Sequence, residues 1–310
     1  MKKVLVTGTF DLLHPGHYRL LQSAKRLGDF LTVVIARDET VKRVKGYNPF
    51  FTQADRVQNM RALGIAHRVI PGGSGDKLSV IASERPDIIC LGYDQHAFTD
   101  DLEKKLTARG FTPRIVRIRR FSAGMFRTGG LHAAGLVALH RTDPTLVIEP
   151  RYATARNFTG QRLYHNRIIL GRTHVARMVK RAQTVLRRQG YGLKIWDCYR
   201  PLSVQKILWC HLPDERYVGN PKKGPVHTRG TGVDCTLVDR RGRPLPMPTK
   251  YDEFSDRAHR QHPPHPTTGW RHSRILEQAM TRAGFEALPT EWWHFSDPRW
   301  KQYPVIDIAI

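Results

Sequence analysis

The sequence has few cysteines and lacks long apolar runs. Its four cysteines, among 310 residues, form no C-x-x-C pair, so they indicate reduced and mostly buried thiols rather than a disulfide framework. No stretch approaches the roughly 18 consecutive apolar residues of a membrane span. The apolar run near the N-terminus is also too short for the core of a signal peptide. We therefore expect a cytoplasmic protein that does not enter a membrane.

Acidic residues are also scarce, because 27 Asp and Glu face 51 Lys and Arg for a formal net charge of +24. This excess favours anionic partners such as nucleotides, nucleic acids or acidic polymers. The basic residues are spread along the chain and form no basic tail or RNA-binding signature, which disfavours dedicated binding of nucleic acid. An arginine-rich source proteome is the alternative explanation of the charge.

The length of the chain and a change of pattern near its middle predict two domains. In residues 1–128, apolar strands alternate with helical segments, which is typical of an α/β doubly wound parallel sheet covered on both faces. Residues 129–142 are small and apolar and are expected to form a linker. Residues 143–310 lack the regular alternation, which predicts a second domain of the α+β class.

The candidate site of the first half lies where its first strand meets its first helix. The segment "GTFDLLHPGH", residues 8–17, follows that strand, and parallel sheets bind ligands at the carboxyl ends of their strands. His14 and His17 stand one helical turn apart beside a helix N-terminus, where N–H groups and the helix dipole can hold phosphate oxygens. A Pro-Gly turn with two solvated histidines is the alternative.

This segment, followed in the correct order by "LGYDQ" at residues 91–95, resembles the signature of the cytidylyltransferase-like nucleotidyltransferases. Glycerol-3-phosphate cytidylyltransferases and archaeal-type FAD synthases are the groups it is most similar to. The resemblance covers residues 1–128 and implies a HIGH-type, Rossmann-like fold. It also implies transfer of CMP or AMP, from CTP or ATP with Mg²⁺, to a phosphorylated acceptor, and it allows a homodimer.

The same resemblance implies roles for individual residues. His14 and His17 would stabilise charge on the α-phosphate, because phosphoryl transfer needs positioning and neutralisation of charge. Lys45 or Arg56 would neutralise the triphosphate. The nucleotide-binding residues implied are Thr9, Phe10, His14, Gly16, His17, Asp94, Arg127 and Thr128.

One motif departs from the family pattern. The segment "MFRTGGLH", residues 125–132, keeps Arg127 and Thr128 but has Gly129 where the family carries a serine. A hydroxyl donor to the phosphates is lost. Three possibilities therefore stay open for this domain: it transfers the nucleotidyl group slowly, it uses a different substrate, or it only binds a nucleotide.

The candidate site of the second half begins in "VHTRGTGVDCTLVD", residues 226–239. His227 precedes Asp234 by seven positions, and the glycines between them let the loop fold back. In the strand that follows, Asp234 points away from the apolar face. An imidazole nitrogen and a carboxylate oxygen suit zinc, although a buried histidine bonded to an aspartate is the commoner outcome of such a pair.

A third ligand is available in "PTEWWHFSD", residues 289–297. Glu291 and His294 lie three positions apart in an aromatic segment, which predicts the wall of a dry pocket. A catalytic zinc keeps three protein ligands and an open position, and a nearby carboxylate takes the proton of the reacting water. We therefore expect His294 as the third ligand and Glu291 as the base. The alternative is a surface glutamate beside two tryptophans.

Five segments of the second half occur together in a recognisable order: "RYATARNFTG", "DCYRP", "HTRGTGVDCTL", "YDEFS" and "EWWHF". They resemble the D-alanyl-D-alanine dipeptidases of the VanX type over residues 143–310. The resemblance implies a zinc peptidase that hydrolyses D-Ala-D-Ala to two D-alanines. It implies Zn²⁺ held by His227, Asp234 and His294, with Glu291 as general base and acid. Arg200, in "DCYRP", would stabilise the transition state, since a guanidinium at a strand end can hold an oxyanion.

Two alternatives to this function remain. In the first, nucleotidyl transfer is the main activity and the hydrolase domain has an altered specificity. In the second, the chain is not an enzyme, and a nucleotide-sensing module is fused to a binder. The histidine-rich segment 259–272 is interpreted as a surface loop, and Cys198 and Cys235 as core residues rather than ligands.

Overall fold

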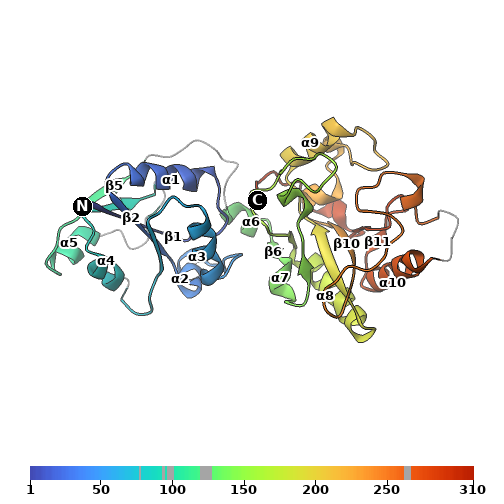
Figure 1. The fold of residues 1–310 in the computed structure, drawn as a ribbon, viewed down its shortest axis with the longest axis horizontal. Helices are drawn as coiled ribbons and strands as arrows, with labels where there is room; N and C mark the ends of the chain where they lie inside the picture. Colours follow the sequence, from blue (N-terminus) through green and yellow to red (C-terminus); the bar gives the residue numbers. More distant parts are fainter. Residues whose placement is uncertain (77, 93–94, 96–100, 119–127, 262–266) are drawn as a thin grey trace. The chain divides into compact units, whose positions relative to one another are not determined.

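The computed structural model describes residues 1–76, 78–92, 95, 101–118, 128–261 and 267–310. By its internal contacts the chain divides into two compact units, Met1–Thr128 and Gly129–Ile310 (Figure 1). Each unit has a five-stranded sheet of its own. Within the described ranges, no helix combines the length and the apolar character that crossing a membrane requires.

The first unit is built on a parallel sheet, as the apolar strands of the sequence predict. Its strand order is β3-β2-β1-β4-β5, and every neighbouring pair is parallel. In chain order its elements are β1 (Lys3–Gly8), α1 (Pro15–Lys25), β2 (Phe30–Ile35), α2 (Asp38–Lys45), α3 (Gln53–Ala62), β3 (Arg68–Pro71), α4 (Leu78–Glu84), β4 (Ile88–Leu91), α5 (Leu102–Thr107) and β5 (Arg114–Arg117).

Apolar residues on both faces of the strands explain why helices cover both sides of this sheet. Along β1, Val4 and Val6 pack in one core with α1 and α3, whereas Leu5 packs in another core with α4 and α5. The doubly wound arrangement expected from the sequence is confirmed. The strand order reverses between β1 and β4, which is where sheets of this kind bind ligands.

The second unit contains a mixed sheet, which confirms the α+β class. Its strand order is β11-β12-β10-β9-β7, in which β10 is antiparallel to β9 and β12, and β7 is parallel to β9. Its elements are α6 (Thr128–Ala133), β6 (Leu136–Ala138), α7 (Leu139–Thr142), β7 (Val147–Ile148), η1 (Arg151–Ala153), β8 (Leu170–Arg172), α8 (Thr173–Arg188), β9 (Tyr191–Asp197), α9 (Leu202–His211), η2 (Pro221–Lys223), η3 (Val226–Arg229), β10 (Gly232–Asp239), η4 (Asp256–Ala258), α10 (Thr268–Arg282), β11 (Glu286–Ala287), β12 (His294–Ser296) and η5 (Trp300–Gln302).

Residues 129–142, expected as a linker, are instead built into the second unit. They carry α6, β6 and α7, and β6 pairs antiparallel with β8. Leu136 and Leu139 are buried, and Leu139 belongs to the main core of the unit. The apolar side chains of this segment, which suggested a connector, instead pack in the second unit.

Helices α8 and α10 contact each other and cover one face of the second sheet. Val233, Cys235 and Leu237 of β10 point into the core beneath these helices. Cys198 is buried in the same core, so both cysteines next to the site motifs serve packing, as expected. Because side chains alternate along a strand, Asp234 faces the other side of the sheet, where the candidate site lies.

Candidate functional site

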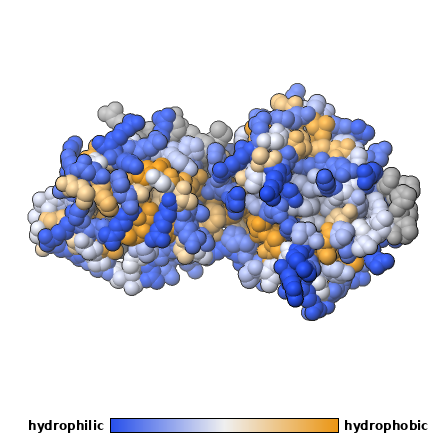
Figure 2. Space-filling view, viewed as in Figure 1, coloured by the Kyte–Doolittle hydropathy of each residue, from blue (hydrophilic) through white to orange (hydrophobic). Residues whose placement is uncertain are grey.

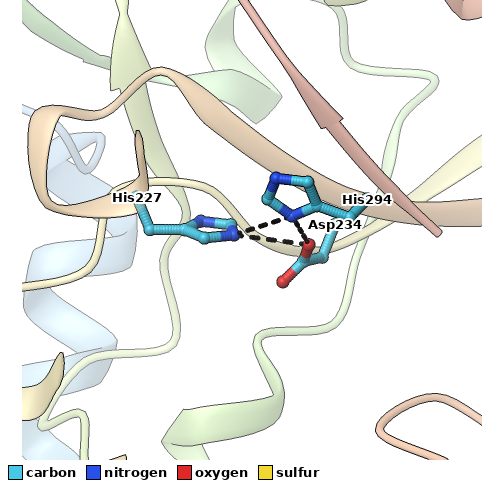
Figure 3. A group of neighbouring side chains, drawn as sticks. All are labelled: His227, Asp234 and His294. Carbon is cyan, nitrogen blue, oxygen red and sulfur yellow. Dashed lines mark hydrogen bonds and ion pairs between the residues drawn. The ribbon is translucent and has the colours of Figure 1, made fainter. Parts of the chain in front are cut away.

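Three side chains of the second unit converge from separate segments. His227 lies in η3, Asp234 in β10 and His294 at the start of β12 (Figure 3). The antiparallel pairing of β10 with β12 places Asp234 opposite His294. All three side chains are buried. The structure therefore brings together the three residues that the sequence marked as metal ligands.

The donor atoms of these residues lie close to one another. Oδ1 of Asp234 is 2.8 Å from Nδ1 of His294 and 3.4 Å from Nε2 of His227, and the two nitrogens are 3.2 Å apart. Ligands placed tetrahedrally about 2.0–2.1 Å from a zinc ion would be about 3.3 Å from each other. Both the chemistry and the spacing of this donor set fit zinc.

Groups behind the donors fix their orientation. The carbonyl oxygen of Cys198 lies 2.7 Å from Nδ1 of His227, so Nδ1 donates its proton and Nε2 keeps a lone pair for a cation. The Tyr251 hydroxyl donates to Oδ2 of Asp234 over 3.0 Å, which leaves Oδ1 turned to the imidazoles. Burial alone would raise the pKa of Asp234, but His227 and His294 hold it below the ordinary range.

Glu291 is buried beside the three donors. Its Oε2 lies 4.0 Å from Nδ1 of His294. Burial raises the pKa of Glu291 well above its ordinary range, and the charges of Asp234 and Asp252 raise it further. A higher pKa brings a carboxyl group closer to neutral pH, where it can both accept and return a proton.

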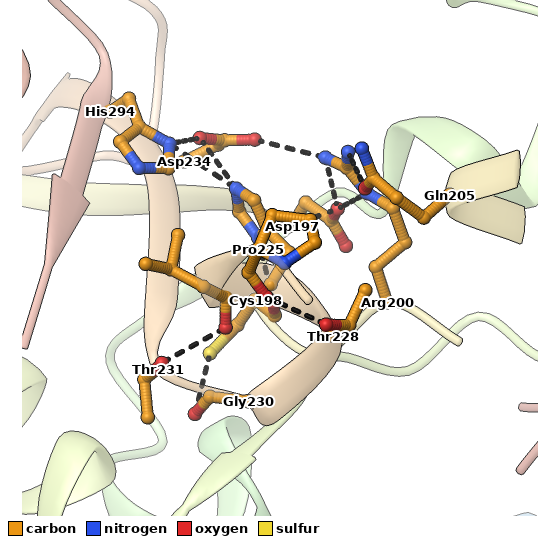
Figure 4. A network of polar contacts seen from close by, with 12 residues as sticks. Asp197, Cys198, Arg200, Gln205, Pro225, Thr228, Gly230, Thr231, Asp234 and His294 are labelled. Atoms are coloured by element: carbon orange, nitrogen blue, oxygen red, sulfur yellow. Dashed lines mark hydrogen bonds and ion pairs between the residues drawn. The ribbon is translucent and has the colours of Figure 1, made fainter. Parts of the chain in front are cut away.

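Arg200 approaches the same centre from the turn after β9 (Figure 4). Its Nη2 is 3.7 Å from Oδ2 of Asp234 and 2.9 Å from Oδ2 of Asp197. Its guanidinium carbon lies 4.9 Å from the ring centroid of Tyr152. A buried cation in this position can stabilise negative charge that develops on a substrate oxygen.

Asp252 is a residue of this centre that the sequence analysis missed. Its Oδ2 is buried and has no hydrogen-bond partner among the residues that the structure describes. Burial raises the pKa of Asp252 well above its ordinary range, and the charge of Asp234 adds to this effect. Its backbone has a φ of 60°, an uncommon conformation outside glycine. The segment "YDEFS" was the only sequence signal near it.

The first unit contains a cavity of about 490 Å³ at the carboxyl ends of β1 and β4. Thr9, Phe10 and His17 line it, as the resemblance implied, together with many aliphatic side chains. Figure 2 shows apolar residues gathered on the visible face of this unit. Lys45 and Arg37 also line the cavity, and Arg37 was not anticipated from the sequence.

His14 and His17 of the first unit form a stacked pair. The ring centroids of His14 and His17 are 3.7 Å apart, and the Phe10 ring meets His17 edge-on at 5.1 Å. Burial lowers the pKa of His17 well below its ordinary range, and His14 adds to the effect. A Cβ at Gly16 would lie 3.0 Å from the His14 ring, which explains a glycine between the histidines.

Arg56 has a different place from the one suggested by the sequence. It is fully buried, donates to the backbone carbonyls of Thr9, Ala36 and Phe51, and pairs with Asp38. These bonds tie together three loops around the cavity. Its guanidinium is thus engaged with the protein, whereas Lys45 and Arg37 line the cavity.

Five other expected nucleotide-binding residues are not among those that line the cavity. His14 and Gly16 are described but do not belong to its lining. Asp94 and Arg127 lie outside the described residues. Thr128 is described only as the first residue of α6. The middle of the histidine-rich segment, residues 262–266, also lies outside the described part.

The folds and the two sites define a fusion of a Rossmann-like unit, first in the sequence, with an α+β unit that carries a buried His/Asp/His cluster able to hold a metal ion. Residues 132–305 match the family described as D-ala-D-ala dipeptidase, and residues 5–148 match the family described as cytidylyltransferase-like. The chain belongs to the D-ala-D-ala dipeptidase family through its second unit and to the cytidylyltransferase-like family through its first.

Known proteins that are similar to this chain each match only one part of it. The D-alanyl-D-alanine dipeptidase of Escherichia coli K12 is 37% identical over 172 residues, which are 55% of this chain and 89% of that protein. The FAD synthase of Ferroglobus placidus is 43% identical over 119 residues, which are 38% of this chain and 77% of that protein. A solved lipopolysaccharide core biosynthesis protein from Thermoplasma volcanium is 41% identical and covers 39% of this chain and 99% of its own, with a TM-score of 0.38.

Proposed function

We propose that the second unit hydrolyses the D-alanyl-D-alanine dipeptide to two D-alanines and that it does so with a bound zinc ion. The observation that carries this proposal is the convergence of His227, Asp234 and His294, whose donor atoms lie within 4.8 Å of one another. The 37% identity with the E. coli dipeptidase supports the choice of substrate. Bound zinc would polarise the peptide carbonyl and lower the pKa of the attacking water.

The residues around the donors supply the remaining chemistry. Glu291 accepts the proton of the attacking water and returns it to the amine that leaves. Arg200 donates N–H groups to the carbonyl oxygen as that oxygen gains negative charge. Both side chains are buried, and charges interact more strongly where water is excluded.

Asp252 fits the free amino terminus of the dipeptide. Its Oδ2 is a buried acceptor without a partner in the described part of the chain. The Asp252 carboxyl group is buried, and Asp234 and Glu291 are among its ionisable neighbours. An ammonium group on the substrate would pair with Asp252 and satisfy the orphaned oxygen.

A panel of alanine dipeptides tests the proposed hydrolysis. We expect release of alanine from D-Ala-D-Ala, much slower release from L-Ala-L-Ala, and none from N-acetyl-D-Ala-D-Ala, in which the ammonium group is blocked. Zinc is measured in the same preparations. Equal rates for the free and the N-acetylated D-dipeptides would contradict the role of Asp252, and no hydrolysis of any dipeptide by zinc-loaded protein would contradict the function.

We propose further that the first unit transfers a nucleotidyl group to a phosphorylated acceptor, with FMN as the favoured acceptor. The observation that favours FMN over glycerol 3-phosphate is the mainly apolar lining of the cavity of about 490 Å³, which suits an aromatic ring system. The 43% identity with the F. placidus FAD synthase supports this choice. His17, at the wall of this cavity, would donate to the phosphate at the point of transfer.

Replacing His17 with alanine is expected to lower nucleotidyl transfer about 10²–10³-fold, as the loss of one preorganised donor commonly does. Pyrophosphate release from ATP or CTP is measured with FMN and, separately, with glycerol 3-phosphate. Tyr18→Phe serves as the control, because the Tyr18 side chain is exposed and should leave the rate unchanged. Wild-type rates in His17→Ala, or no release by the wild type with any pair, would contradict the proposed transfer.

A further inference from the structure

Most of the donors of Arg200 are already used inside the protein (Figure 4). A guanidinium group carries five N–H donors in one plane. Nε and Nη2 each lie 2.9 Å from Oδ2 of Asp197, and Nη1 lies 2.8 Å from Oε1 of Gln205. These bonds leave one N–H on each terminal nitrogen for other groups, within the contacts made by the described residues.

Asp197 alone does not fix the direction of those remaining N–H groups. Both of its bonds to Arg200 end on the same oxygen, Oδ2, so the guanidinium can rock about that one point. The Tyr152 ring restrains the tilt of the guanidinium plane. The bond from Nη1 to Gln205 lies on the other side of the group, and it removes the remaining rotation within the plane.

Gln205 is itself held firmly in place. Its side chain is buried near the start of α9, and its Nε2 donates to the carbonyl oxygen of Gly219 over 2.7 Å. That bond requires the amide nitrogen to face Gly219 and turns the amide oxygen to Arg200. The Asp307 carboxylate accepts from the backbone N–H of Ser203 over 2.8 Å, which anchors the first turn of the helix that carries Gln205.

We propose that Gln205 is a positioning residue of the hydrolase centre, which orients Arg200 so that its remaining N–H groups meet the oxygen that gains charge. This inference rests on the proposed hydrolysis. Gln205 acts only through Arg200, and a misplacement of about 1 Å in such a group can cost 10²-fold in rate. Loss of Gln205 should therefore lower kcat and change KM little.

Gln205→Leu tests the proposal, because it keeps the size of the side chain and removes both hydrogen bonds. We expect kcat for D-Ala-D-Ala to fall about 10–100-fold, with KM within about threefold and zinc content unchanged. Gln205→Glu keeps an acceptor oxygen toward Arg200 and should regain most of kcat. Gln183→Leu is the matched control, since Gln183 is an equally buried amide that bonds to Thr145 and to the N–H of Leu193.

A second measurement does not depend on activity. In the metal-free protein, the ¹⁵N-resolved Nη1–H signal of Arg200, assigned with Arg200→Lys, should exchange slowly in the wild type and in Gln183→Leu, where Gln205 accepts from Nη1, and rapidly in Gln205→Leu. An unchanged signal in Gln205→Leu, or equal losses of kcat in the two leucine variants, would overturn the positioning role. If the wild type hydrolyses no dipeptide, the proposed function fails, and the exchange rates still decide whether Gln205 holds Arg200.

Discussion

Replacing Glu291 with glutamine is expected to abolish hydrolysis of D-Ala-D-Ala while leaving zinc bound. Glutamine has the shape of glutamate but cannot accept and return a proton, so we expect kcat to fall about 10²–10⁴-fold. The metal should stay because Glu291 is not one of the three converging donors, and its Oε2 lies 4.0 Å from Nδ1 of His294. Rates and zinc content are measured on the same preparation.

Glu286→Gln is the control for this experiment. Glu286 is exposed on β11, which is paired with the strand that carries His294. Its replacement with glutamine makes the same chemical change outside the centre. Its kcat should equal that of the wild type. Wild-type hydrolysis by Glu291→Gln would show that another group handles the proton, and loss of zinc from this variant would show that Glu291 belongs to the ligand set.

Replacing His227 with alanine is expected to remove both zinc and hydrolysis. Only three protein donors converge in the described centre, so loss of one leaves the carboxylate of Asp234 and the imidazole of His294. Several kcal/mol of transition-state stabilisation would be lost with the metal, and 1.36 kcal/mol corresponds to a tenfold change in rate. We therefore expect the rate to fall by about 10³-fold or more. Free imidazole, which fits the space left by the side chain, should restore part of both.

His272→Ala separates this effect from the loss of any buried histidine. His272 is also buried in the second unit, where its Nδ1 lies 2.8 Å from the carbonyl oxygen of Pro246, and it belongs to α10 rather than to the donor set. This variant should unfold more easily but keep zinc and turnover. Retention of full zinc content and full activity by His227→Ala would contradict the proposed ligand set.

The parts of the structure that could be predicted depend on regular patterns in the sequence. The continuous apolar strands of the first half dictate a sheet covered on both faces, and this is what Val4, Leu5 and Val6 show. In β10, strand alternation placed Asp234 on the face opposite the apolar residues. His294 was expected as the third ligand from its place near Glu291 in an aromatic segment and from the resemblance to a known family, whereas no local pattern predicts the pairing of β10 with β12 that brings it to Asp234.

The features that could not be predicted depend on packing between distant segments. Arg56 and Lys45 are both basic residues near the first cavity, and only the fold shows that Arg56 is enclosed by backbone carbonyls. Asp252 enters the centre through an irregular turn with a positive φ, which sequence periodicity does not reveal. Gln205 gains its importance from contacts with Arg200 and Gly219, to which no motif points.

The decisive experiment is a zinc titration of the metal-free protein with D-Ala-D-Ala as substrate. If His227, Asp234 and His294 hold one ion that the reaction requires, hydrolysis starts from zero, rises in proportion to added zinc and stops rising at one zinc per chain. Full hydrolysis by protein free of zinc would contradict the proposed centre, as would tight binding of one zinc per chain without hydrolysis of the dipeptide.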